Sequence, residues 1–185
     1  MNTGLISYRY ACTLLEFSID NGEEKEVYES MKFLNDVFIE TSLLRQSLND
    51  RSVSKAKKKK LMITACGGNI PESLDKMLDL ILKNEREDVL HFIALKYMEL
   101  YRERFDIESA KLITATEMDK NDYDKFLSRI ESMSKSKIEL ETEVNENLIG
   151  GFILQVGDYR WDASLKGKLD RLRRSLRGDE EIIKY

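Results

Sequence analysis

Apolar residues in the first 105 positions recur at the three- and four-residue spacing of amphipathic helices. Each apolar run ends at a pair of turn-forming residues, and Pro71 stands where a new helix would begin. The pattern predicts six helices, over about residues 4–19, 23–38, 43–48, 52–66, 71–83 and 86–104. The last of these is apolar around most of its circumference, as the central helix of a bundle should be.

The first predicted helix carries two apolar stripes instead of one. The first stripe contains Leu5, Tyr8, Cys12, Leu15 and Ile19, and the second contains Ile6, Tyr10, Leu14 and Phe17. We expect one stripe to enter the core of the bundle. The other must meet a second neighbour, either another helix of the bundle or a partner protein.

The periodicity changes after residue 105. A short β-rich segment (110–116) precedes a helix that begins near Asp119, and strict apolar–polar alternation follows in residues 138–145. The remaining predicted elements are a strand over 149–156, a turn at Gly157-Asp158, a returning strand over 159–161, and a last helix capped by Asp162 or Ser164. The chain is therefore predicted to be mainly α, with an N-terminal six-helix bundle (1–105) and a small α+β C-terminal domain (106–185).

Composition limits the possible functions. The chain is 42% hydrophobic, which is enough for a core, and its net charge of −4 gives no general reason to expect nucleic acid as the partner. No segment resembles a signal peptide, and Lys96 and Glu99 interrupt the densest apolar stretch. We expect no direct membrane insertion. Cys12 and Cys66 lack a disulfide or metal-ligand pattern and are expected to be buried thiols.

No set of residues predicts catalysis, a metal or a cofactor. His91 is the single histidine and has no convergent partner in the sequence. Gly67-Gly68 and Gly150-Gly151 lack the Lys-Ser/Thr of a phosphate loop. Three carboxylates project from one face of the alternating strand, which favours an edge or solvent face over a metal site. These are Glu139, Glu141 and Glu143.

Two segments are strongly basic. The lysines of residues 55–60 point in several directions on a helix, so we expect a solvated helix there. The last helix places a leucine stripe among six lysines and arginines. We favour a core-packed helix with a basic outer face, and membrane or nucleic-acid binding are the alternatives. Its leucines are Leu165, Leu169, Leu172 and Leu176.

The segment from Leu148 to Leu169 resembles the C-terminal signature of the delta subunit family of F-type ATP synthases, which includes the mitochondrial oligomycin sensitivity-conferring protein. Its features are a Gly-Gly that enters a strand, a Gly-Asp turn, and an Asp-x-Ser before a Gly-x-Leu helix. They correspond here to Gly150, Gly151, Gly157, Asp158, Asp162, Ser164, Gly167 and Leu169. The resemblance extends over nearly the whole chain, although Trp161 stands where the family usually has a smaller aliphatic residue.

The resemblance implies a non-catalytic stator subunit without cofactors. In the family, the helical domain binds N-terminal helices of the alpha subunits on the catalytic head. The C-terminal domain engages the b subunits of the peripheral stalk. The resemblance thus implies a peripheral membrane protein on the cytoplasmic face of the bacterial inner membrane. It would couple proton-driven rotation to ATP synthesis by holding the head still.

The resemblance also points to the first and fifth helices as the groove for the alpha-subunit helix. From their stripes, we expect the groove to be lined by Tyr10, Thr13, Leu14, Met77, Leu80 and Ile81. Leu14 and Ile81 fit the bundle core equally well. Two other functions stay open at this point: a helical adaptor of another complex, and nucleic-acid binding through the basic last helix. An enzymatic function is the least favoured, because no set of residues predicts catalysis.

Overall fold

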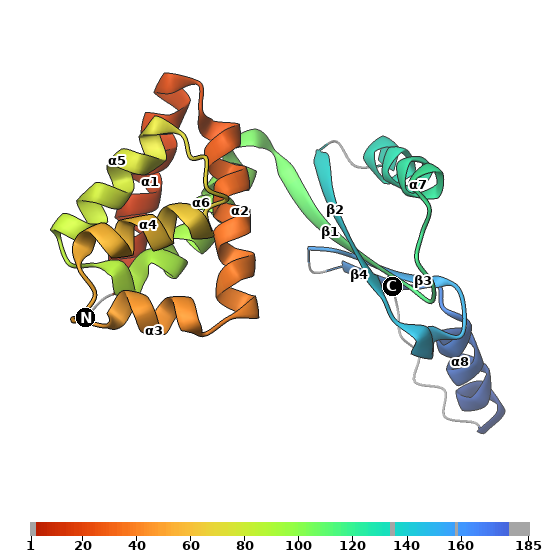
Figure 1. The fold of residues 1–185 in the computed structure, drawn as a ribbon. Coiled ribbons are helices and arrows are strands. Elements are labelled where there is room, and N and C mark those ends of the chain that lie inside the picture. Colours follow the sequence, from red (N-terminus) through yellow and green to blue (C-terminus); the bar gives the residue numbers. More distant parts are fainter. Residues whose placement is uncertain (1–2, 134–135, 158, 178–185) are drawn as a thin grey trace. The chain divides into compact units, whose positions relative to one another are not determined.

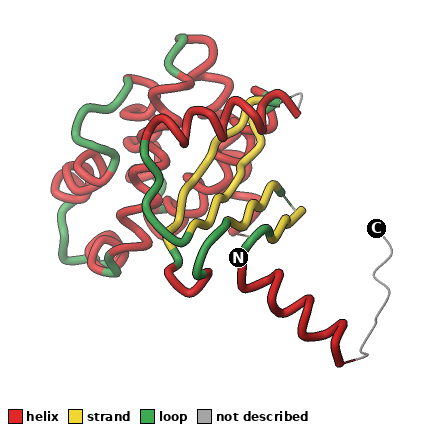
Figure 2. The backbone as a smooth tube through the Cα atoms, turned by 90° about the vertical axis from the view of Figure 1, so that its right-hand side faces the viewer, coloured by secondary structure: helices red, strands yellow, loops and turns green. Residues whose placement is uncertain are grey.

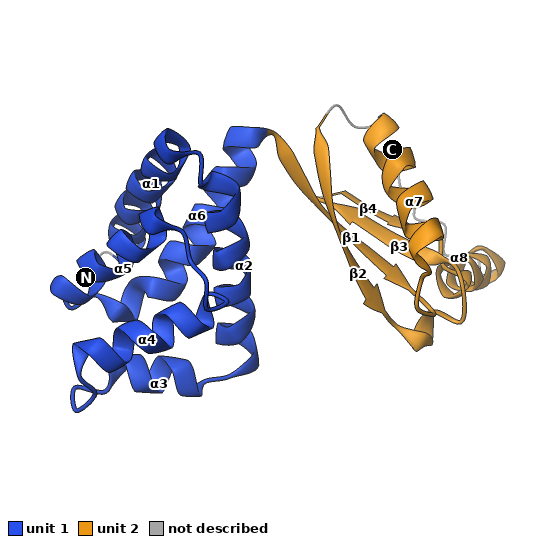
Figure 3. Ribbon diagram, turned by 45° about the horizontal axis from the view of Figure 1, so that its top comes forward, with its two compact units in different colours: residues 1–105 blue, residues 106–185 orange. Residues whose placement is uncertain are grey.

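The computed structural model describes residues 3–133, 136–157 and 159–177. The chain divides into two compact units, Met1–Phe105 and Asp106–Tyr185 (Figure 3). Unit 1 is helical and unit 2 combines helices with one sheet, so the predicted fold class is confirmed.

Unit 1 is a bundle of six α-helices with one short 3-10 turn (Figure 1). The bundle is built around α6, whose buried side chains include Leu90, Ile93 and Tyr97. Its elements are α1 (Thr3–Asn21), α2 (Glu24–Glu40), α3 (Leu43–Asn49), α4 (Lys55–Ala65), α5 (Glu72–Lys83), η1 (Glu87–Val89) and α6 (Leu90–Phe105).

The helix α1 packs differently from the prediction that one of its two apolar stripes enters the core. Its buried line runs between the stripes, through Ser7, Ala11 and Ser18 together with Leu14 and Leu15. Small residues let helix axes approach closely, so Ala11 and the two serines form the centre of the contact face. The two apolar stripes therefore lie on either side of this contact face, and each is partly exposed.

A hydrogen-bonded tyrosine ties three helices together at the centre of unit 1. Tyr97 of α6 is fully buried. Its hydroxyl lies 3.0 Å from the Ser18 hydroxyl at the end of α1 and donates to the carbonyl oxygen of Glu24 at 3.1 Å. Burial raises the pKa of the Tyr97 phenol. Because a buried hydroxyl without a partner is costly, these two bonds fix where α1 ends and α2 begins relative to α6.

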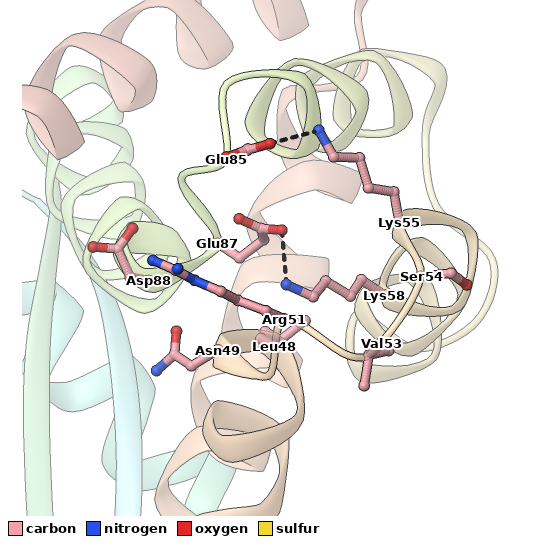
Figure 4. Close-up of a pocket in the computed structure, with 10 residues that line it drawn as sticks. All are labelled: Leu48, Asn49, Arg51, Val53, Ser54, Lys55, Lys58, Glu85, Glu87 and Asp88. Atoms are coloured by element: carbon pink, nitrogen blue, oxygen red, sulfur yellow. Dashed lines mark hydrogen bonds and ion pairs between the residues drawn. The ribbon is translucent and has the colours of Figure 1, made fainter.

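The lysine-rich helix α4 is not a freely solvated helix as predicted. Lys58 is buried and forms an ion pair with Glu87 of η1, with 3.1 Å between Nζ and Oε1 and each side chain 9% exposed. The pair lies beside a polar surface pocket of about 620 Å³ (Figure 4). Lys59 binds Asp75 and Asp79 of α5. The basic run thus docks α4 onto the acidic side chains of neighbouring elements.

Unit 2 is a four-stranded sheet with strand order β2-β1-β3-β4. The strands β1 and β2 are parallel, and α7 connects them, whereas the other neighbours are antiparallel. The strand β1 begins earlier than predicted because its pairing with β2 starts at Ile107. The elements are β1 (Ile107–Thr114), α7 (Lys120–Met133), β2 (Lys137–Val144), η2 (Glu146–Leu148), β3 (Phe152–Val156), β4 (Tyr159–Asp162) and α8 (Leu165–Arg177).

The signature residues build the junction between the hairpin and α8. A Cβ on Gly151, which has φ of +77°, would lie 2.4 Å from the carbonyl oxygen of Ala163. The Asp162 carboxylate accepts hydrogen bonds from the Ser164 amide and hydroxyl, and these bonds lower its pKa. The Ser164 hydroxyl in turn accepts from the Gly167 amide at 2.9 Å, which caps α8.

The other signature positions divide into structural and exposed residues. Gly157 has φ of +55°, which a hairpin turn favours. Leu165 covers Gly150 closely, with only 3.0 Å between its Cδ1 and a Cβ built on this glycine. Leu169 is exposed on α8. Asp158 lies outside the described residues.

We predict that Lys58→Met destabilises unit 1 by roughly 2 kcal/mol, because it leaves the Glu87 carboxylate uncompensated beside a pocket that water enters. The measurement is urea unfolding followed by the helical circular dichroism signal. The control is Lys55→Met, which breaks the exposed pair with Glu85 and should cost under about 0.5 kcal/mol. Equal losses for both variants would contradict a special role for the buried pair.

We predict that Gly151→Ala destabilises unit 2 by about 2 kcal/mol or more, because it adds a backbone clash to an unfavourable φ. Unfolding followed by fluorescence of Trp161, the single tryptophan in the chain, measures the effect in this unit. Gly157→Ala is the matched control, because its φ is also positive but a Cβ there meets open space. It should cost only about 1 kcal/mol, and an equal cost for both would rule out the clash with Ala163.

Candidate partner-binding surfaces

The described residues offer surfaces for other proteins and no reactive centre. They contain no group of three or more His, Cys, Asp or Glu side chains placed to hold a metal ion. His91 stacks on Phe38 and lies within hydrogen-bond distance of Asn35 and Arg45. Its burial and, secondarily, Arg45 lower its pKa, so the histidine is a neutral packing residue near pH 7. No helix in the described part of the chain is long and apolar enough to cross a membrane.

Cys66 does not have a reactive environment either. Cys66 is buried, and burial raises the pKa of its thiol to about 12. A thiol with such a pKa stays protonated and is a poor nucleophile. Cys12 is only half-buried, so the prediction of buried thiols holds for Cys66 and not fully for Cys12.

The helices α1 and α5 run antiparallel and form a continuous seam, which we call the α1–α5 seam. Three contacts mark its length. Asn21 donates to the Ser73 hydroxyl at 3.0 Å at one end, and Asn84 donates to the Tyr10 hydroxyl at 2.9 Å at the other. Between them, the Lys76 ammonium lies 5.3 Å from the centre of the Phe17 ring. Figure 1 shows the two helices side by side.

All six residues predicted to line a groove lie on these two helices, but only three reach the surface. Leu14 and Ile81 are fully buried and Met77 is nearly so, because α1 and α5 are in direct contact and the side chains between them belong to the bundle core. Tyr10 is half-buried, Thr13 is exposed and Leu80 is 42% exposed. The three buried residues thus form the floor between the two helices. The three accessible residues lie along the edges of the seam, which we call its rim.

Two further side chains belong to the rim of the α1–α5 seam. Phe17 lies one helical turn beyond Thr13 and is partly exposed. Lys76 contacts it from α5. The sequence signal that could have identified Phe17 is its spacing from Tyr10 and Thr13, which places all three on one face of the helix.

A small basic pocket of about 380 Å³ lies at the Tyr10 end of the seam. Arg9 and Arg86 line it together with Ile6, Tyr10 and Asn84. One guanidinium nitrogen of Arg86, Nη1, is buried and has no hydrogen-bond partner among the described residues. A carboxylate or carbonyl oxygen from a bound partner could pair with the guanidinium groups that line the pocket.

In unit 2, one face of the sheet is only half covered. The helix α7 packs on a core that contains Leu112, Ile138 and Leu140, and the Tyr123 hydroxyl of α7 donates to the carbonyl of Leu140 at 3.0 Å. A helix is about 10 Å wide and strands lie about 4.8 Å apart, so one helix covers about two strands. Four strands need a second helix on this face.

The uncovered half of that face is an apolar groove of about 650 Å³ between α7 and β4, which we call the sheet groove. Pairing across β1, β3 and β4 places Trp161 beside Leu154 and Tyr159 beside Val156, on the same face as the core. Trp161 is 55% exposed, and its ring lies nearly parallel to that of Tyr159. The aromatic side chains therefore form an exposed wall of the groove.

The prediction that the last helix, α8, packs into a core is wrong. Its leucine stripe does not pack into the core of unit 2: Leu165, Leu169, Leu172 and Leu176 are 48%, 50%, 59% and 86% exposed. Figure 2 shows α8 extending away from the strands of its own unit. The Asp162–Ser164 cap sets the start of the helix.

The chain resembles known proteins over almost its whole length. Residues 6–176 match the family model described as ATP synthase delta (OSCP) subunit. The ATP synthase subunit delta of Bacteroides thetaiotaomicron is 35% identical over 94% of each chain. The protein of the same name from Parabacteroides distasonis is 35% identical over 95% of this chain and 98% of its own.

A solved structure shares the fold. A chain in the cryo-electron microscopy structure of the Toxoplasma gondii mitochondrial ATP synthase hexamer superposes with a TM-score of 0.63, over 92% of this chain and 97% of that chain, at 19% identity. With the family match and the two bacterial relatives, the conclusion is that this chain belongs to the ATP synthase delta (OSCP) subunit family.

Proposed function

We propose that this chain holds the catalytic head of an F-type ATP synthase to its peripheral stalk, so that proton-driven rotation does work on the catalytic sites. Membership of the delta (OSCP) family makes the chain a non-catalytic peripheral stalk subunit of that complex. The observation that carries the proposal is the pair of helix-sized apolar surfaces, one on each unit. A static linker needs such surfaces and no reactive groups.

The α1–α5 seam is the proposed contact with the head. An amphipathic helix laid along the seam would cover Tyr10, Phe17 and Leu80, which water now reaches. The proposed occupant is an N-terminal helix of an alpha subunit. Leu14, Met77 and Ile81 support the seam from beneath, because they hold α1 and α5 at a fixed separation. The basic pocket at Arg9 and Arg86 suits an acidic residue or a free carbonyl of that helix.

Unit 2 is the proposed contact with the b subunits. The sheet groove lacks a covering helix on its β3–β4 side, and an apolar helix face from the stalk would complete the layer. With these partners, the chain would be a peripheral membrane protein on the cytoplasmic face of the bacterial inner membrane.

We predict that Tyr10→Asp and Leu80→Asp each weaken binding of an alpha-subunit N-terminal peptide at least about tenfold, because each places a carboxylate against the apolar face of the peptide. Isothermal titration calorimetry measures the affinity, and thermal unfolding checks that the bundle is intact.

The matched control for these variants is Phe33→Asp. Phe33 is an exposed aromatic on α2, outside the seam, so this substitution should leave the affinity unchanged. The head contact would have to be placed elsewhere in either of two cases. In the first, Phe33→Asp weakens peptide binding as much as the seam variants do. In the second, the seam variants bind the peptide with unchanged affinity.

We predict that a C-terminal b-subunit peptide shifts the fluorescence of Trp161 to shorter wavelength, because the indole would move from water into an apolar contact. Trp161→Glu should weaken binding by about tenfold or more, as measured by calorimetry. Gln155→Glu is the control, since Gln155 is exposed on the opposite face of the sheet. An unshifted spectrum with full binding would remove the sheet groove from the interface.

A further inference from the structure

The exposed leucines of α8 follow the spacing of a coiled-coil seam. Leu165, Leu169, Leu172 and Leu176 are separated by four, three and four residues, which is the alternation of the two apolar positions of a heptad. On a helix with about 100° per residue they fall within a stripe roughly 60° wide. A helix that packs on a globular core usually has an apolar stripe of about 100° or more. The narrow stripe is typical of a helix that pairs with one other helix.

The charged residues that flank this stripe share one sign of charge. Lys166 and Arg173 lie on one side of the leucines and Lys168 on the other, at the positions that face a partner's flanks in a coiled coil. All three are exposed. The single acidic residue of α8, Asp170, lies away from the leucines, and its carboxylate pairs with Arg173. Arg174 donates to the backbone carbonyl of Asp170. Three of the four flanking positions are therefore basic and the fourth, Ser175, is uncharged, in a chain whose net charge is −4.

We propose that α8 is one strand of a two-helix coiled coil whose other strand is a heptad helix from a partner protein with acidic flanking residues. Charge complementarity identifies the partner: acidic side chains beside its apolar seam would meet Lys166, Lys168 and Arg173. The same charges exclude a second copy of α8, because like charges would face each other along the pair.

A lipid surface is the less favoured occupant. Helices that lie in a membrane interface combine a broad apolar face with aromatic anchors. The helix α8 has no aromatic residue and only its narrow leucine stripe. The inference rests on the proposed function only in expecting that unit 2 has a helical partner within an assembly, and it adds the chemistry by which α8 selects that partner.

The test uses the full chain and two designed peptides of about three heptads, both with leucine at the apolar positions. One peptide carries Glu at the flanking positions and the other carries Lys. In calorimetry at low salt, we expect the acidic peptide to bind about tenfold or more tightly than the basic one. The preference should shrink as salt rises from about 50 to about 500 mM, because exposed charge pairs are screened.

A matched pair of variants checks the geometry. Arg173→Glu should reduce the preference for the acidic peptide several-fold, and the triple variant K166E/K168E/R173E should reverse it. Arg174→Glu makes the same charge change one residue further along, on the side away from the leucines, and should alter the preference less than about twofold. Leu172→Ser should weaken the binding of both peptides. Circular dichroism and Trp161 fluorescence confirm that each variant is folded.

Several results would overturn the inference. These are equal binding of the two peptides, equal effects of Arg173→Glu and Arg174→Glu, self-association of the chain through α8 in ultracentrifugation, and binding to phosphatidylglycerol vesicles without any preference between the peptides. None of them bears on whether the chain assembles with the synthase. Conversely, a failure to co-purify with alpha and b subunits would overturn the proposed function and leave the charge preference in place.

Discussion

The buried hydroxyl of Tyr97 is the constraint on which unit 1 depends. Its bonds to Ser18 and to the Glu24 carbonyl hold the end of α1 and the start of α2 against α6 in the middle of an apolar core. With that end fixed, the small residues Ser7 and Ala11 bring the rest of α1 onto the bundle. The bulky apolar residues of α1 then lie on either side of the contact face. The α1–α5 seam, with its exposed rim, is a consequence of this packing.

Unit 2 leaves surface uncovered for a related reason. A β1–α7–β2 crossover supplies one helix, and one helix covers about two strands of a four-strand sheet. The chain provides a further helix, but the bonds of Asp162 and Ser164 start α8 in a direction that leaves its leucines in water. The unit thus has an open sheet groove and an unpaired helix, and both are completed by helices from other chains in the proposed assembly.

These incomplete surfaces fit a protein that transmits force and performs no chemistry. A stator must resist torque, so it needs contacts that are extended along elements of fixed shape. Helix-on-helix and helix-on-sheet contacts meet that need, because apolar burial provides affinity and flanking charges select the partner. The Lys58–Glu87 pair and the close packing of Gly151 on Ala163 belong to the internal structure of each unit.

Much of the fold could be predicted from the sequence, because helix periods, turn residues and caps are local signals. The six helices of unit 1, the order of elements in unit 2 and the choice of Asp162 or Ser164 as the cap of the last helix all came from such signals, and the structure assigns the cap to Ser164. The tertiary structure decided which apolar side chains are core and which are surface. Leu14 and Leu80 were both predicted to line the groove, yet only Leu80 is exposed, and the leucines of α8 were expected in the core but are exposed. Periodicity defines the apolar face of a helix, but burial depends on what other segments place against that face, which no local pattern contains.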